Sequence, residues 1–418
     1  MNKEHTLIIG AGPAAIQTAV LVANGWRSKV SILNRNDSYS RSVQNHLEQK
    51  GRVIKSIAEN RPFLSGQVQI SHFYNGYSDV NNQFDTIILS VPSYSYKEVI
   101  HQLKLDNLKK VTTIILLSAG FGSNREVKNL VDEVNREIEV ISLSTYYAAT
   151  KFKLVDDVLF AYTKAVKKRV YLATSNNGGE IDSVKGLLED AGIRTVVMEN
   201  SINAECRNIT TYVHPPFFIN EFSMNEILAE EPSVKSLYKL YPEGPITQET
   251  VRIMVKLWKE ISALVKELGG EPINLLQFLN DDNYPVHEVS LSRSDIDDFP
   301  VLDTVKQEYL LYIRYSSILI DPFSEPDESG AYFDFSKVPY KQVTQMVNGD
   351  WIIPRIPLED YKNLLMIYQV GKESGISMPQ TLMLIKLFER KVKNWQVLKG
   401  GVVRDLELHT MGERNTFA

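Results

Sequence analysis

The stretch LIIGAGPAAIQTAVLVA, from Leu7 to Ala23, decides the fold of the first half of the chain. It places Gly10, Gly12 and Ala15 in G-x-G-x-x-A spacing, between an apolar run that predicts a strand and a segment that predicts a helix. Such glycines permit a tight turn and let a pyrophosphate approach the backbone, while the small third residue keeps the helix close to the sheet. We therefore expect a dinucleotide site with its phosphates at the helix N-terminus. Its expected contacts are Gly10, Ala11, Gly12, Pro13 and Ala14.

The second predicted strand ends without the carboxylate that this fold commonly places there. The stretch SILNRNDSYSR, residues 31–41, offers Asn34 and Arg35 instead. A carboxylate would accept hydrogen bonds from a ribose 2′-hydroxyl and repel a 2′-phosphate, whereas an arginine fork grips a phosphate. With Arg41 returning from the next helix, Arg35 predicts NADP(H) rather than NAD(H). Two alternatives stay open: both arginines are surface residues, or Asp37 is a displaced ribose ligand.

The first two hundred residues alternate short apolar runs with helical segments. Runs that are apolar throughout, rather than alternating, are typical of strands covered on both faces. They predict an α/β domain with a doubly wound, mostly parallel sheet. The runs are TLIIGAG, KVSILNR, FDTIILSVP, VTTIILLSAG, IEVISLST, RVYLATS and RTVVMEN.

After about Ser201 the pattern becomes mainly helical. In PITQETVRIMVKLWKEISALVKELGG the apolar residues recur at helical spacing, Pro245 suits the start and Gly269 with Gly270 the stop. VKQEYLLYIRYSSILI and PQTLMLIKLFERKVKNW predict further helices. The segment DPFSEPDESGAYFDFSKVP, rich in Pro, Gly, Asp and Ser, predicts an irregular insertion. We expect one domain over residues 1–200 and a second, mainly helical one over residues 201–418.

Composition excludes several classes of protein. The chain of 418 residues is 43% hydrophobic and 23% charged, as in ordinary globular proteins. Its net charge of -5 gives no reason to expect a nucleic-acid partner, and we interpret its best basic cluster, Lys164, Lys167, Lys168 and Arg169, as a solvated helix end.

Cysteine, histidine and hydropathy patterns narrow the setting further. Cys206 is the only cysteine, so an internal disulfide is impossible and the cytoplasm is the expected location. No CxxC or HExxH pattern occurs, so we expect no metal site in the protein. MNKEH leads straight into the strand-like TLIIG, and no apolar run is long enough to span a membrane.

Seven longer motifs carry a resemblance that extends from Ile8 to about Asp360. They are GAGPAAIQ, ISLSTYYAATK, AECRN, YVHPPFFINEFS, YKLYPEGPIT, NLLQFLNDDNYPV and QEYLLYIRYSSILIDPFSEPDESGAYFDFS. Together they resemble the metallophore-forming opine dehydrogenases, the enzymes of staphylopine, pseudopaline and yersinopine biosynthesis. The resemblance implies an NADPH-dependent reductive condensation of a 2-oxo acid with the amine of a nicotianamine-like aminobutyrate-histidine intermediate. The implied product is an opine that chelates divalent metals.

By motif, His214 matches the proposed catalytic histidine of that family, and Arg35 and Arg41 match its positions for the 2′-phosphate. Two prolines follow His214 and restrict the local backbone. An imidazole there could donate the proton with which the ketone oxygen leaves as water. More distant opine dehydrogenases pair the histidine with an aspartate, and Asp321 in ILIDPFS is a candidate, although an Asp-Pro pair suits a turn equally well.

Substrate contacts are expected from polar and aromatic residues elsewhere. Arg207, Asn208 and Arg314 are the candidates for substrate carboxylates, because an arginine in an apolar helix needs an anionic partner. An internal salt bridge explains Arg314 equally well. Tyr146 and Trp258 could line the pocket, although Trp258 also fits the core stripe of its helix.

One departure from the family pattern bears on the 2-oxo acid. In STYYAATK, Ala149 stands where staphylopine-type enzymes carry an aspartate. A carboxylate there would repel the distal carboxylate of 2-oxoglutarate, whereas alanine removes the repulsion, and Lys151 or Lys153 could attract the substrate. The sequence therefore favours 2-oxoglutarate, with pyruvate next.

Two rival functions remain open at this point. Another two-domain NADP-dependent dehydrogenase, such as an amino-acid opine enzyme or a ketopantoate-reductase-like enzyme, would turn over simpler substrates. An NADP-sensing binding protein would lack the catalytic setting of His214, which is present. We expect residues 1–200 to bind NADP and residues 201–418 to supply substrate binding, catalysis and the contacts of a homodimer.

Overall fold

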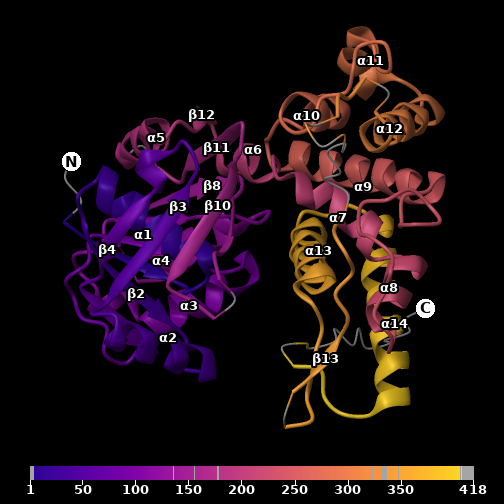
Figure 1. Cartoon of the computed structure of the whole chain (residues 1–418). Helices are drawn as coiled ribbons and strands as arrows, with labels where there is room; N and C mark the ends of the chain where they lie inside the picture. Colours follow the sequence, from indigo (N-terminus) through magenta and orange to yellow (C-terminus); the bar gives the residue numbers. More distant parts are fainter. Residues whose placement is uncertain are drawn as a thin grey trace, which may run out of the picture. The chain divides into compact units, whose positions relative to one another are not determined.

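A computed structural model describes residues 4–404 and 406, except 135, 155, 177, 322, 327, 329, 331–336 and 347. The chain forms two compact units (Figure 1). Unit 1 is Met1–Asn208 with Leu268–Ile273, and unit 2 is Ile209–Glu267 with Asn274–Ala418. Helix α6 (Ser201–Glu205), which the sequence analysis assigned to the second domain, therefore belongs to unit 1.

Unit 1 is built on an eight-stranded sheet in the order β12-β11-β8-β7-β6-β1-β2-β5. Neighbouring strands pair in parallel except β11 and β8, which are antiparallel. The seven apolar runs form seven of the eight strands of this sheet, as predicted, and β5 is the strand that they did not predict. The strands are β1 (His5–Ile9), β2 (Lys29–Asn34), β5 (His72–Asn75), β6 (Thr86–Leu89), β7 (Thr113–Leu116), β8 (Glu139–Leu143), β11 (Arg169–Thr174) and β12 (Arg194–Val197).

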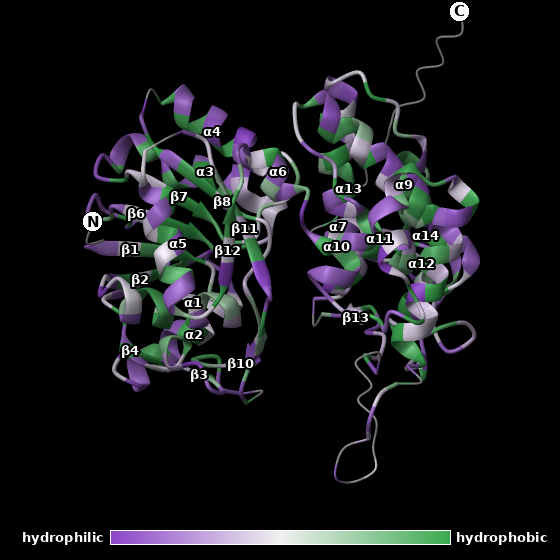
Figure 2. Cartoon of the chain, turned by 90° about the horizontal axis from the view of Figure 1, so that it is seen from above, coloured by the Kyte–Doolittle hydropathy of each residue, from purple (hydrophilic) through white to green (hydrophobic). Residues whose placement is uncertain are grey.

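Helices cover both faces of this sheet. Ile8 packs into the core with α1 (Pro13–Gly25), α2 (Ser38–Gln49) and α5 (Glu180–Asp190). Leu7 and Ile9 pack into a second core with α3 (Tyr96–Leu103) and α4 (Ser123–Glu133). Because consecutive side chains point to opposite faces, burial on both sides requires continuous apolar runs. Figure 2 shows the hydrophobic strands between more polar helices.

A second, four-stranded sheet in the order β4-β3-β10-β9 lies against α1. It was not predicted from the sequence, because its strands mix buried with more exposed residues and contain no continuous apolar run. Its strands are β3 (Val53–Ala58), β4 (Gly66–Gln69), β9 (Ala148–Phe152) and β10 (Phe160–Val166). Lys164 lies in β10 and Arg169 begins β11, so the interpretation of the basic cluster as a helix end was wrong. The cluster is the connection between two strands.

Glu205 fixes α6 within unit 1. Its carboxylate accepts hydrogen bonds from the backbone N–H of Gly122 at 2.8 Å and of Asn124 at 2.7 Å, at the N-terminus of α4. Those N–H groups have no partner inside their own helix, and a carboxylate is favourable there. Complete burial raises the pKa of Glu205 to about 8.

Unit 2 is mainly helical. Helix α9 packs against α7, α12 and α14, and α13 packs against α7 and α14. The three helices predicted in this half are α9, α12 and α14. The helices are α7 (Ile209–Phe218), α8 (Glu221–Leu228), α9 (Gln248–Glu267), α10 (Leu275–Asp281), α11 (Arg293–Asp298), α12 (Thr304–Leu319), α13 (Arg355–Glu373) and α14 (Pro379–Lys399). A small ribbon joins β13 (Thr344–Gln345) and β14 (Trp351–Ile352). Much of the predicted irregular insertion lies outside the described residues.

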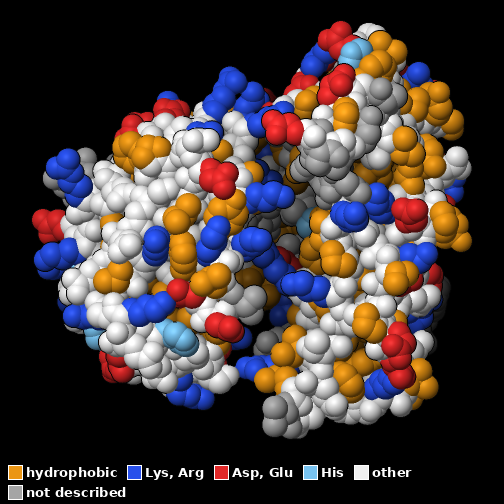
Figure 3. Space-filling view, viewed as in Figure 1, with side chains coloured by type: hydrophobic (Ala, Val, Ile, Leu, Met, Phe, Trp, Pro, Cys, Tyr) orange, Lys and Arg blue, Asp and Glu red, His pale blue; other side chains and the backbone are white. Residues whose placement is uncertain are grey.

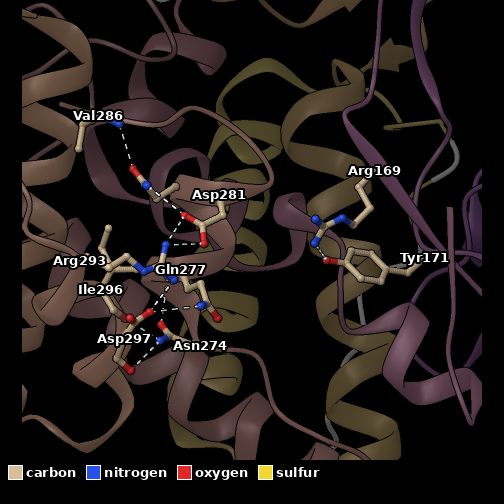
Figure 4. A network of polar contacts seen from close by, with 10 residues as sticks. Arg169, Tyr171, Asn274, Gln277, Asp281, Val286, Arg293, Ile296 and Asp297 are labelled. Atoms are coloured by element: carbon tan, nitrogen blue, oxygen red, sulfur yellow. Dashed lines mark hydrogen bonds and ion pairs between the residues drawn. The ribbon is translucent and has the colours of Figure 1, made fainter. Parts of the chain in front are cut away.

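Polar contacts join α10 to α11. Arg293 at the start of α11 donates to Asp281 at 2.9 Å and pairs with Asp297 (Figure 4).

Acidic and basic side chains are interspersed over the face of the molecule in Figure 3. Among the described helices, none has the length and apolar character needed to cross a bilayer.

Candidate functional site

The glycine turn of unit 1 has the geometry that its spacing predicts. Gly10 has φ +116°, and a Cβ there would lie 2.6 Å from the carbonyl oxygen of Ser90, so only glycine fits. Gly12 is the N-cap of α1 and Pro13 its first residue. A Cβ on Gly12 would meet nothing within 4 Å. The turn therefore leaves space in front of the helix N-terminus, where a pyrophosphate would fit.

Arg35 and Arg41 flank the turn between β2 and α2. The Asp37 carboxylate caps α2 by accepting from the backbone N–H of Ser40 at 2.8 Å, and it accepts from Arg35 Nε at 2.9 Å. Arg41 Nη1 lies 3.3 Å from the side-chain oxygen of Asn36. Both arginines are exposed, and the side chain of Arg35 is 62% accessible. Because the Asp37 carboxylate is used to cap α2, Arg35 and Arg41 are better placed than Asp37 to contact the 2′ substituent of a ribose.

Tyr39 supports the same turn, and the sequence analysis missed it. Its hydroxyl donates to the carbonyl oxygen of Ala11 at 2.9 Å. Burial and the nearby Asp37 raise the pKa of Tyr39 to about 12, so the hydroxyl stays protonated. Its place in the sequence, an aromatic residue in the first turn of the helix after β2, could have indicated that Tyr39 supports the turn.

Tyr146 takes part in a buried polar network rather than presenting a free hydroxyl. Its hydroxyl donates to Gln17 on α1 at 2.9 Å and lies 2.8 Å from the hydroxyl of Thr150. Tyr147 donates to the same Gln17 oxygen at 2.6 Å. The network fixes the start of β9 against α1, so Tyr146 positions the strand that carries Ala149.

Ala149 lies exposed on β9, opposite Ala165 on β10. Neither strand contains an acidic residue. Lys151 is exposed on β9 as well, and the Lys153 ammonium lies 4.3 Å from the centre of the Tyr162 ring. The backbone N–H of Lys167 donates to the carbonyl of Tyr147 at 2.8 Å, just beyond the paired strands. The hairpin thus presents lysines without a compensating carboxylate on either strand.

Arg207 lies beside Tyr171. Its guanidinium carbon is 5.4 Å from the centre of the Tyr171 ring, and its Nη1 donates to the carbonyl of Asn203 at 2.5 Å. Arg169 donates to the Tyr171 hydroxyl at 3.3 Å (Figure 4). Asn208 follows in the chain and is half-buried. The structure thus gathers two guanidinium groups around one tyrosine in unit 1.

His214 lies on α7 of unit 2, and both of its ring nitrogens have partners. Nδ1 lies 3.1 Å from Oδ1 of Asp360 on α13, and Nε2 lies 3.2 Å from the hydroxyl of Tyr238. The edge of the Phe218 ring packs on the imidazole, with the ring centres 4.9 Å apart. The side chain is 16% accessible. These contacts hold the imidazole in a single orientation, as a proton donor or acceptor requires.

Asp360 is the carboxylate partner, and the sequence analysis missed it. Burial raises the pKa of Asp360, and the nearby His214 opposes the shift. Its Oδ2 is buried and has no hydrogen-bond partner within the described residues. The signal was its position: Asp360 falls on the buried stripe of α13 with Pro357, Leu364 and Ile367, where a carboxylate is unusual.

Asp321, expected as the histidine's partner, does not contact His214. It is exposed after α12, and its carboxylate accepts from the backbone N–H of Phe323 at 2.9 Å. That contact is a local turn, which the Asp-Pro pair suits equally well. The expectation that Asp321 pairs with His214 was wrong, because residues distant in sequence bring Asp360 there instead.

Arg314 and Trp258 have structural surroundings. Arg314 is 2% exposed, and its Nη2 donates to the carbonyls of Leu279 at 2.7 Å and Tyr284 at 2.9 Å. It therefore holds the C-terminal end of α10, and no carboxylate among the described residues pairs with it. These contacts do not favour a substrate role. Trp258 is 5% exposed on α9, with its ring 5.3 Å from that of Phe299, so it lies in the core.

Comparisons with known proteins agree with the motifs. The model of a family described as staphylopine dehydrogenase matches residues 4–407. The chain belongs to this family. It is 38% identical to pseudopaline synthase of Pseudomonas aeruginosa (strain UCBPP-PA14), over 94% of this chain and 90% of that protein. It is 35% identical to staphylopine synthase of Staphylococcus aureus (strain Mu50 / ATCC 700699), over 98% of this chain and 95% of that protein.

A solved structure agrees with the same membership. The structure of yersinopine dehydrogenase with NADP+ bound superimposes with a TM-score of 0.88 at 33% identity, over 96% of this chain and 93% of that one. The chain is thus an oxidoreductase of the opine dehydrogenase type, with the Rossmann and helical architecture that its sequence predicts.

Proposed function

We propose that the protein is an NADPH-dependent opine dehydrogenase that joins a 2-oxo acid to the amine of an aminobutyrate-extended histidine. The observation that carries this proposal is the pairing of His214 with Asp360 in a family member. The ketone oxygen must leave as water before the new carbon–nitrogen bond is reduced. A fixed imidazole beside a carboxylate suits that proton transfer.

The cofactor assignment rests on unit 1. The space in front of Gly12 and the N-terminus of α1 would hold the pyrophosphate, and Arg35 and Arg41 would hold the 2′-phosphate. Bound there, NADPH supplies a hydride for the carbon–nitrogen double bond. The related yersinopine dehydrogenase structure has NADP+ bound, which supports the same choice of cofactor.

His214 supplies the proton chemistry. With Asp360 ionised, Nδ1–H donates to Oδ1, and Nε2 remains as the nitrogen that takes up and gives back a proton. The carboxylate also stabilises the imidazolium form, because an opposite charge lies within hydrogen-bonding distance. The pair therefore serves as base when the amine attacks and as acid when water leaves.

The 2-oxo acid is 2-oxoglutarate, with pyruvate as the second candidate. Ala149 adds no negative charge to β9, and Lys151, Lys153 and Lys167 lie on or beside the same hairpin. Burial lowers the pKa of Lys167, and Lys167 makes no ion pair with another described residue. A half-buried ammonium of this kind suits an anionic ligand. Arg207 and Asn208 are kept as proposed contacts of the substrate carboxylates.

We also propose that the protein is a homodimer and is located in the cytoplasm. A homodimer formed by unit 2 would cover exposed aliphatic residues such as Val301 and Val305 near the start of α12. Cys206 is a buried free thiol, which suits a reducing compartment such as the cytoplasm. Light scattering of the purified chain tests the dimer, because a monomer mass contradicts it.

Turnover assays test the proposed function. NADPH consumption is followed with the aminobutyrate-extended histidine and either 2-oxoglutarate or pyruvate, with NADH and with free histidine as comparisons. The proposal expects NADPH and the extended amine to be required, and 2-oxoglutarate to be preferred. Equal turnover with a free amino acid would favour a simpler opine enzyme, and NADPH binding without turnover would favour a sensor.

A further inference from the structure

Tyr238 occupies the side of His214 from which a substrate would be protonated. Its hydroxyl lies 3.2 Å from Nε2, while Nδ1 is already committed to Asp360. A substrate oxygen therefore meets the tyrosine hydroxyl at the nitrogen that the proposed reaction needs. The two rings are linked through Phe218, whose ring packs edge-on against that of Tyr238 with 5.4 Å between centres.

The loop that carries Tyr238 is held on both sides of it. The N–H of Leu237 donates to the carbonyl of Val338 at 2.8 Å, and the N–H of Tyr241 donates to Ile246 at 3.0 Å. The following turn is compact, because a Cβ on Gly244 would lie 2.4 Å from the carbonyl oxygen of Lys239. The hydroxyl is therefore placed by backbone contacts, and its position does not depend on His214 alone.

A tyrosine hydroxyl matches both protonation states of the imidazole. It donates to Nε2 when that nitrogen carries a lone pair, and it accepts from Nε2–H when the ring is charged. Burial, followed by the nearby Asp360, raises the pKa of Tyr238, so the phenol keeps its proton at neutral pH. A group that donates and accepts without ionising can pass a proton along a chain.

We propose that Tyr238 is a catalytic residue that relays the proton between Nε2 of His214 and the oxygen that leaves the substrate; this inference rests on the proposed function. At the aminoalcohol formed by amine and ketone, the phenol O–H bond breaks and its proton joins the departing hydroxyl, which leaves as water. The carbon–oxygen bond breaks with its electron pair on oxygen, and the nitrogen lone pair forms the carbon–nitrogen double bond. Nε2–H returns a proton to the phenol oxygen, so imidazolium becomes imidazole and the positive charge passes to the iminium product.

The first test removes the hydroxyl and keeps the ring. Tyr238→Phe retains the contact with Phe218 and is expected to lower kcat about 100-fold while KM for the 2-oxo acid changes less than about twofold. Tyr340→Phe is the matched control, because it removes the hydroxyl of another tyrosine of unit 2, one that lies 2.8 Å from the hydroxyl of Ser223. A kcat for Tyr238→Phe within about twofold of the wild type overturns the relay.

The second test keeps the hydroxyl and changes its acidity. A difluorotyrosine at position 238 makes the phenol more acidic while preserving its contacts, so a relay predicts a kcat that differs from the wild type by more than about twofold. An unchanged kcat assigns the hydroxyl to positioning alone and overturns the inference. Wild-type turnover is measured first, because its absence contradicts the proposed function, whereas active wild-type and equally active variants contradict only the relay.

Discussion

Asp360→Asn separates the catalytic value of the His214–Asp360 pair from its effect on stability. The amide keeps the shape of the carboxyl group but removes the charged acceptor at 3.1 Å from Nδ1. A hydrogen bond to a charged group is worth about 1.5–3 kcal/mol, which corresponds to a loss of about 10- to 100-fold in kcat. The unfolding free energy should change by less than about 1 kcal/mol, because a buried charge is lost together with the bond.

The pH dependence of stability gives the same variant a second signature. Since burial raises the pKa of Asp360, the folded state holds its proton to higher pH than the unfolded state. The contribution of Asp360 to stability is therefore complete below its unfolded-state pKa and is lost as pH rises through the raised folded-state pKa. The amide of Asp360→Asn does not titrate, so the variant avoids this loss of stability. The stability of the variant relative to the wild type should therefore rise with pH between the unfolded-state and folded-state pKa of Asp360.

Steady-state NADPH oxidation and urea unfolding at several pH values measure the two effects. Asp321→Asn is the matched control, since it makes the same chemical change at an exposed aspartate in the same unit. We expect it to leave kcat within about twofold of the wild type. The reasoning is refuted if Asp360→Asn keeps full activity, or if Asp321→Asn loses as much activity as Asp360→Asn.

Three further substitutions test unit 1. Arg35→Gln should raise KM for NADPH about 10-fold, because a charge-assisted contact is lost, and should leave KM for NADH within about twofold. Equal effects on both cofactors would mean that Arg35 does not face the 2′-phosphate. Gly10→Ala should destabilise the fold by about 1–3 kcal/mol because of its positive φ, whereas Gly12→Ala should leave the melting temperature unchanged and weaken NADPH binding. Thermal unfolding and cofactor titration measure the two effects. Unchanged NADPH binding by Gly12→Ala would contradict the pyrophosphate site in front of Gly12. Ala149→Asp should lower the ratio of kcat/KM for 2-oxoglutarate to kcat/KM for pyruvate about 10-fold by charge repulsion. An unchanged ratio would mean that residue 149 does not discriminate between the two 2-oxo acids.

The sequence predicted the parts of the protein that depend on local pattern. The apolar runs became strands of the main sheet because burial on both faces demands continuous hydrophobicity, and Gly10 has the positive φ that its turn requires. The second sheet was not predicted, because strands such as β3 alternate buried with more exposed residues and therefore form no continuous apolar run.

The partners of His214 could not be predicted from spacing. Asp360 lies 146 positions from His214 along the chain, and the helices α7 and α13 must pack before the contact exists. Tyr238 reaches the other nitrogen from a loop whose shape is set by backbone contacts around Gly244. Asp321 was expected to pair with His214 because of its Asp-Pro sequence. Its carboxylate instead accepts a hydrogen bond from the neighbouring backbone N–H of Phe323.

The most direct test of the central claim is the mass of the product. The purified protein is incubated with NADPH, the aminobutyrate-extended histidine and 2-oxoglutarate, and the mixture is analysed by mass spectrometry. An opine dehydrogenase yields a product with the mass of amine plus 2-oxo acid, less water and plus two hydrogen atoms, and His214→Ala abolishes it. Recovery of the amine unchanged, with NADPH consumed and the 2-oxo acid reduced to a 2-hydroxy acid, would contradict the account.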